Sequence, residues 1–143
     1  EMVGFYKQNN LTLIDILNQV YQTFGYFIEH TDNFFFEGIQ GKEDMKQILN
    51  HLRETSIHVP SLSFIESRDY LIQQGLKNGQ PFKLDLPKSN VLEYRYDEGF
   101  IILRPSGTEP KLKVYYGFHS LTFAGAQAHI KESQAIIQTV LKG

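Results

Sequence analysis

The chain has 143 residues, a formal net charge of −2 and a hydrophobic content of 41%. This is enough for one buried core, and one domain with a short appended element is the expected organisation. The slight acidic excess argues against a nucleic-acid partner, because affinity for a phosphate backbone needs clustered positive charge. The sequence contains no cysteine, which excludes disulfides and thiolate chemistry and favours the cytoplasm as its compartment.

The sequence also lacks the signals of a membrane or secreted protein. No window approaches the roughly 18 continuous apolar residues of a membrane span. Residues 1–7 lack the layout of a signal peptide, so we expect no membrane partner. Because Met2 follows Glu1 and no initiator stands first, we interpret the chain as a piece of a longer protein.

The first predicted element is an amphipathic helix over residues 12–24. Its apolar side chains recur every three or four positions, at Leu13, Ile16, Leu17, Val20, Tyr21 and Phe24. This spacing forms one helical stripe, and Gly25 is a typical helix end. Residues 26–33 have the composition of an aromatic, polar connector. We therefore assign residues 1–30 to the last helix of a preceding domain and a linker, and residues 31–143 to a separate C-terminal domain.

The C-terminal domain is predicted to begin with a strand at Phe34–Phe36. A helix over residues 42–54 follows, with Glu43 and Asp44 suited to its N-terminus. After Pro60, residues 62–70 partly alternate in polarity and predict a strand. Residues 73–90 are predicted to form a loop, because they include two glycines and two prolines.

The second half of the domain has clearer patterns. Strands are predicted at residues 92–96 and 100–103, joined by a turn at 97–99, and at residues 112–116. A closing amphipathic helix covers residues 122–141. The order strand, helix, four strands, helix predicts an α+β fold. In it an antiparallel sheet carries both helices on one face, so that all apolar stripes are buried together.

The stretch Arg104–Pro110, Arg-Pro-Ser-Gly-Thr-Glu-Pro, has the composition of a phosphate-binding loop. Arg104 offers a planar fork of donors, and Ser106 and Thr108 each offer a hydroxyl. Gly107 has no Cβ, so the backbone there can turn and point successive N–H groups into an anion-binding nest. These residues predict a local site for a phosphate group in a chain without excess positive charge.

A plain turn is the competing interpretation of this loop, because Ser, Gly and Thr are common in turns. It leaves unexplained why a guanidinium follows a buried strand directly. Glu109 disfavours an anion unless its carboxylate points away or braces Arg104 or Lys113.

Other polar features favour structural roles. The spacing of the five histidines is not that of metal ligands. They are His30, His51, His58, His119 and His129. The acidic pair at 43–44 opens a helix and the pair at 97–98 fills a turn, so neither predicts a catalytic dyad. The polar loop at residues 88–90 either contacts a ligand or shapes the start of the next strand. We favour the second interpretation because Ser and Asn often bond local backbone.

With the strand Phe100–Leu103, this loop and the strand Lys111–Tyr116 considered together, the sequence resembles the α-D-phosphohexomutases, the phosphoglucomutase and phosphomannomutase family. The resemblance extends to the stretch Leu86–Leu92, to residues 36–43 and to the helix over residues 12–24. It therefore covers nearly the whole chain.

Members of that family have four domains, and this chain resembles the last one. The resemblance implies a fold similar to the TATA-box-binding protein, and a loop that holds the sugar phosphate that is not reacting. By this resemblance Arg104, Ser106, Gly107 and Thr108 bind that phosphate, and Lys113 is a further cation. It implies no catalytic residue and no metal ligand in this chain.

The resemblance also implies the reaction of the complete enzyme, which moves a phosphoryl group between the 1- and 6-hydroxyls of a hexose through a bisphosphorylated sugar. Family members use a phosphoserine, a magnesium ion on an Asp-Gly-Asp-Gly-Asp motif and a sugar-reading loop, each in an earlier domain. None of these motifs occurs here. We therefore expect the chain to need its upstream domains, to bind a hexose phosphate and to be inactive alone. Overall likeness favours phosphoglucomutase over phosphomannomutase. The alternative is a non-catalytic module that binds a phosphorylated ligand or a protein.

Overall fold

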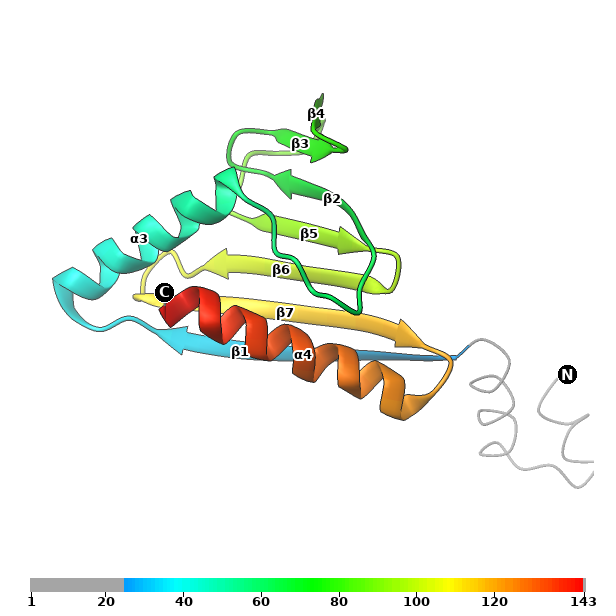
Figure 1. Ribbon diagram of the computed structural model, residues 1–143. Coiled ribbons are helices and arrows are strands. Elements are labelled where there is room, and N and C mark those ends of the chain that lie inside the picture. Colours follow the sequence, from blue (N-terminus) through cyan, green and yellow to red (C-terminus); the bar gives the residue numbers. More distant parts are fainter. Residues whose placement is uncertain (1–24, 143) are drawn as a thin grey trace, which may run out of the picture.

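The computed structural model describes residues 25–142, which form one antiparallel sheet and two helices (Figure 1). The elements in chain order are β1 (Tyr26–Phe35), α3 (Gly38–Glu54), β2 (Phe64–Asp69), β3 (Gln74–Lys77), β4 (Gln80–Lys83), β5 (Leu92–Tyr96), β6 (Gly99–Pro105), β7 (Lys111–Ser120) and α4 (Phe123–Lys142). The helix predicted over residues 12–24 lies outside the described residues. Neither described helix is long and apolar enough to cross a lipid bilayer.

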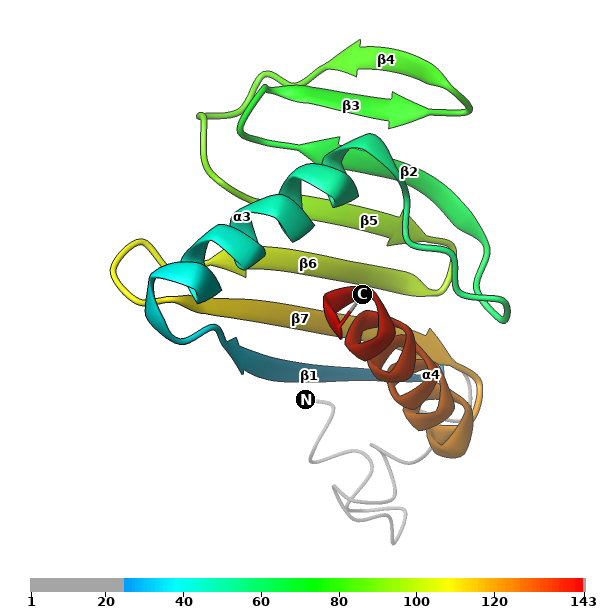
Figure 2. The same ribbon diagram turned by 60° about the vertical axis from the view of Figure 1, so that its left-hand side comes forward.

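The sheet has the strand order β1-β7-β6-β5-β2-β3-β4, and every neighbouring pair is antiparallel. Both helices cover the same face of the sheet, and the other face carries no helix from residues 25–142 (Figures 1 and 2). The predicted α+β class, with an antiparallel sheet flanked by two helices, is confirmed. The number of strands between the helices is larger than predicted, because β3 and β4 extend the sheet.

The predicted loop over residues 73–90 is wrong in its first part, where β3 and β4 form a hairpin. Asn78 and Gly79 make the turn, and both have positive φ angles, of 53° and 76°. A two-residue Asn-Gly turn of this kind matches the twist of the strands on either side. The hairpin lies at the edge of the sheet. Pro81 in β4 has no backbone N–H, which is tolerated there because no further strand of the described residues lies beside β4 to accept a hydrogen bond from it.

The predicted connector over residues 26–33 is also wrong, because β1 starts at Tyr26. This strand pairs with β7 along its whole length, from Tyr26 opposite Ser120 to Phe35 opposite Lys111. Polar residues are tolerated there because β1 is an edge strand, with one side open to solvent. The boundary placed between residues 30 and 31 therefore falls inside a strand.

Helix α3 begins at Gly38, four residues before its predicted start, and its first turn contains no acidic residue. A Cβ at Gly41 would lie 2.5 Å from the carbonyl carbon of Phe36, so only glycine allows this close approach. The Phe36 N–H in turn donates to the carbonyl oxygen of Pro110, at 2.7 Å. The start of α3 is thus fixed against the connection between β6 and β7.

The core lies between the helices and the sheet, and two tyrosines of β5 connect both layers. The Tyr94 hydroxyl donates to the carbonyl oxygen of Leu52 at 2.7 Å, and the Tyr96 hydroxyl to that of Ile57 at 2.6 Å. Both side chains are almost completely buried. These bonds hold the C-terminal end of α3 and the segment after it on the sheet.

We predict that the domain loses stability at alkaline pH through Tyr94 and Tyr96. Burial raises the pKa of both hydroxyls above the ordinary value of about 10. Their contribution to the free energy of unfolding is therefore complete below about pH 10 and falls as the pH rises beyond it. Thermal unfolding at increasing pH, followed by circular dichroism and by tyrosinate absorbance, measures this loss. Ionisation of both tyrosines in the folded domain would contradict the prediction.

Candidate phosphate-binding site

The loop singled out in the sequence connects β6 to β7 at one end of the sheet. Arg104 and Pro105 are the last residues of β6, and Lys111 is the first residue of β7. The Ser106 N–H donates to the carbonyl oxygen of Lys111 at 2.8 Å, which closes the loop. Figure 2 shows the loop beside the start of α3.

Two of the predicted residues, Arg104 and Lys113, are direct cross-strand neighbours in the register of β6 and β7. Their side chains lie on the face without helices, because the buried Leu103 and Val114 face the core from the alternate positions. Two like charges opposite each other destabilise a sheet. Within residues 25–142, neither cation forms an ion pair with a carboxylate. The arrangement therefore favours a bound anion between them.

Other arginines on the same face of the sheet are neutralised. The Nε of Arg68 lies 2.7 Å from Oε2 of Glu66, and the Nε of Arg95 lies 2.7 Å from Oε2 of Glu93. The arginines of β2 and β5 on this face are thus paired with carboxylates, whereas Arg104 of β6 is not.

Glu109 does not brace either of these cations. Its Oε2 lies 3.7 Å from the Nζ of Lys111. That Nζ also lies 5.9 Å from the centre of the Phe35 ring, over its face. The carboxylate that disfavoured an anion site is therefore paired with a different lysine.

The Ser106 hydroxyl organises the loop from inside. Its oxygen accepts hydrogen bonds from the N–H groups of Thr108 at 3.4 Å and Glu109 at 3.2 Å. The predicted nest of free N–H groups is therefore incomplete, since an unpaired N–H is costly and the hydroxyl satisfies two of them. Because the oxygen accepts both bonds, the hydroxyl proton remains to donate outward.

The loop does not use the conformational freedom predicted for Gly107. The φ angle of Gly107 is not among the positive ones, and a Cβ placed on it would meet no atom within 4 Å. The loop therefore does not need glycine for its own conformation. Gly107 instead leaves open space on the loop, next to the exposed Thr108.

Arg53, which no sequence pattern indicated, holds the neighbouring loop at residues 88–90. The Nη2 of Arg53 donates to Oδ1 of Asn90 at 2.5 Å, and its Nε lies 3.3 Å from Oδ2 of Asp69. Leu92 pairs with Leu103, so this loop lies at the same end of the sheet as Arg104. No local spacing predicts these contacts, because they join residues from a helix, a strand and a loop.

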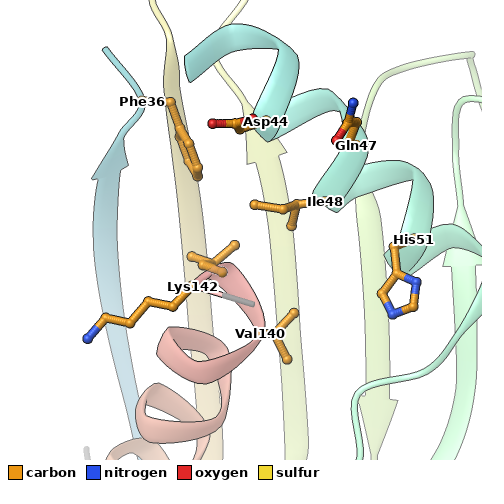
Figure 3. A pocket seen from close by; sticks show the side chains of 8 residues that line it. Phe36, Asp44, Gln47, Ile48, His51, Val140 and Lys142 are labelled. Carbon is orange, nitrogen blue, oxygen red and sulfur yellow. The ribbon is translucent and has the colours of Figure 1, made fainter. Parts of the chain in front are cut away.

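A groove of about 640 Å³ lies on the helix side of the sheet (Figure 3). Arg104 and Lys113 lie on the opposite face. The groove separates α3 from the end of α4 and is lined by Phe36, Asp44, Gln47, Ile48, His51, Val140, Leu141 and Lys142. Asp44 accepts a hydrogen bond from Gln40, at 2.9 Å. In the described part of the chain, no group of three His, Cys, Asp or Glu residues is placed to hold a metal ion.

Residues 40–121, which include the loop and Lys113, match the family of the phosphoglucomutase/phosphomannomutase C-terminal domain. A phosphoglucomutase of Staphylococcus aureus strain MRSA252 is 42% identical over 110 residues, which are 73% of this chain and 19% of that protein. A phosphoglucomutase of strain MSSA476 is 38% identical over 118 residues, 78% of this chain and 21% of that protein. A phosphoglucomutase of Staphylococcus saprophyticus is 32% identical over 112 residues, which are 76% of this chain and 20% of that protein. The chain spans about a fifth of the length of these relatives.

We predict that Gly107→Ala separates folding from anion binding. The thermal midpoint should stay unchanged or rise slightly, because the added Cβ meets no atom and the unfolded chain loses entropy. Affinity for inorganic phosphate should fall, because the methyl group occupies the open side of the loop. Thermal unfolding and a phosphate titration of the same variant test both parts. A loss of stability with unchanged affinity would contradict them.

We also predict that Arg53→Leu destabilises the domain by about 2–3 kcal/mol, because it leaves the largely buried Asp69 carboxylate unpaired. The matched control is Lys83→Ala, which removes a partner of Asp85 in a pair whose side chains are both more than 80% exposed. An exposed pair of this kind contributes little, so the control should unfold like the wild type. Equal effects of the two substitutions in urea unfolding would refute the assignment.

Proposed function

The chain belongs to the phosphoglucomutase/phosphomannomutase family through its C-terminal domain, and we propose that it holds the substrate phosphate in a hexose-phosphate mutase. The complete enzyme would interconvert hexose 1-phosphate and hexose 6-phosphate through a bisphosphorylated sugar. We propose glucose rather than mannose as the hexose, in line with the relatives, which are phosphoglucomutases.

The observation that carries this proposal is the cross-strand pair of Arg104 and Lys113, which has no carboxylate partner in the described residues. A phosphate monoester brings close to two negative charges and three acceptor oxygens. Arg104 can donate two parallel hydrogen bonds, and Lys113 adds a compact charge. The Ser106 and Thr108 hydroxyls then donate to the remaining oxygen positions.

Such a site contributes positioning rather than chemistry. Phosphoryl transfer needs little covalent help from a protein and much alignment and charge stabilisation. Holding one phosphate of the sugar fixes where the hydroxyl at the other end lies. A bisphosphorylated intermediate can then turn over, so that either phosphate occupies the same loop.

The remaining parts of the reaction are proposed for upstream domains that this chain does not contain. These would supply the phosphoserine, the site of a magnesium ion and the reading of the sugar, and a hexose 1,6-bisphosphate would serve as the activating intermediate. The chain alone would be inactive. We propose that the C-terminal domain begins at about Tyr26, where β1 starts. We also propose that the complete enzyme lies in the cytoplasm.

We predict that Arg104→Ala in the complete enzyme costs about 2–4 kcal/mol of phosphate interaction, by the loss of a charge-assisted partner. This corresponds to a decrease in kcat/KM of about 30- to 1,000-fold. The control is Lys83→Ala, which removes a cation from β4 at the other edge of the sheet and should leave kcat/KM unchanged.

Steady-state kinetics with glucose 1-phosphate and with mannose 1-phosphate measure this effect and the sugar preference together. Unchanged kcat/KM for Arg104→Ala would refute the assignment of the loop. A complete protein without mutase activity that still binds phosphorylated ligands through Arg104 would support the alternative, a non-catalytic binding module.

A further inference from the structure

Phe35 is an exposed aromatic residue that the core does not use. Its neighbours Phe34 and Phe36 pack against the core, whereas Phe35 points to the opposite face and is 67% exposed. Exposed apolar side chains are common on protein surfaces, and Ile39 and Leu121 are more exposed than Phe35, so Phe35 is distinguished by its position.

The position of Phe35 relates it to the phosphate-binding loop. It pairs with Lys111 in the register of β1 and β7, two residues along from the pair of Asn33 and Lys113. Lys113 in turn pairs with Arg104. Phe35, Lys113 and Arg104 therefore lie on one face of the sheet, at the same end of three adjacent strands.

The spacing between ring and cations exceeds the size of a phosphate group. Phe35 and Arg104 are separated by two strand spacings, about 10 Å, and by two residues along the strands, about 7 Å. A phosphate held by Arg104 and Lys113 therefore leaves room before the ring. A hexose attached to that phosphate is a group of suitable size to occupy it.

The ring has a lysine neighbour before any ligand arrives. The Nζ of Lys111 lies over one of its faces, 5.9 Å from its centre, and Glu109 pairs with the same lysine at 3.7 Å. Phe35 is 67% exposed, so much of the ring surface remains accessible. An aromatic side chain has only two rotatable bonds, so it loses little conformational freedom on binding.

We propose that Phe35 is a sugar-contacting residue whose exposed ring stacks on the hexose of the phosphosugar held by Arg104 and Lys113. This inference rests on the proposed function and names the part of the substrate that lies beyond the phosphate. The C–H groups of a pyranose ring form an apolar face with a small positive potential, which matches the negative face of an aromatic ring. Asn33, exposed beside Lys113, supplies an amide for a sugar hydroxyl.

The test compares two ligands in the complete enzyme, glucose 6-phosphate and inorganic phosphate, by calorimetric titration. Phe35→Ala should weaken glucose 6-phosphate binding about 3- to 10-fold and leave inorganic phosphate binding unchanged. Phe35→Trp should restore the sugar-phosphate affinity. Phe35→Leu keeps the apolar bulk without an aromatic face, and it replaces the alanine variant if that variant does not fold.

The matched control is Phe27→Ala, because Phe27 lies on the same face of the same strand, at its other end, and is 51% exposed. It should change neither affinity. The inference is overturned if Phe35→Ala weakens both ligands equally or neither, or if Phe27→Ala has the same effect. Failure of the proposed function gives a different result, in which Arg104→Ala leaves both affinities unchanged.

Discussion

Two cations placed directly opposite each other, Arg104 on β6 and Lys113 on β7, are the constraint on which the site depends. Like charges in this position cost free energy, and three nearby carboxylates are paired with other residues. Glu66, Glu93 and Glu109 each pair with a different cation. The candidate site is therefore a pair of like charges that the folded domain holds together and that a bound phosphate would neutralise.

The scaffold keeps this pair in place through β7. This strand pairs with β1 on one side and β6 on the other, so its register sets both the cation pair and the position of Phe35. On the other face, α3 is fixed to the same loop through the hydrogen bond from Phe36 to Pro110. Gly41 allows the helix to approach Phe36 closely. A change in any of these contacts would move the loop relative to its cations.

Much of this fold could be predicted from the sequence because its signals are local. Alternation marked β5 and β7, a short apolar run marked β6, and helical spacing marked α3 and α4. Two of the misses depended on distant partners. Residues 29–33 of β1 are polar and become part of a strand only by pairing with β7, and the Arg53–Asp69 contact joins a helix to a strand. The Asn78–Gly79 turn was a local signal of the hairpin, but it lay among prolines and glycines that indicated a loop.

The candidate site could be named from residue types, but its geometry could not. The sequence predicted the cation and the hydroxyls. Only the fold shows that the Ser106 hydroxyl accepts hydrogen bonds from two backbone N–H groups and that Glu109 pairs with Lys111. The central claim is that this loop binds phosphate. Its most direct test is an NMR titration of the 143-residue chain with inorganic phosphate. We predict saturable shifts of the Ser106, Gly107 and Thr108 amides and of the Arg104 side chain, weakened by salt. Shifts confined to other residues, or none at high phosphate, would contradict it.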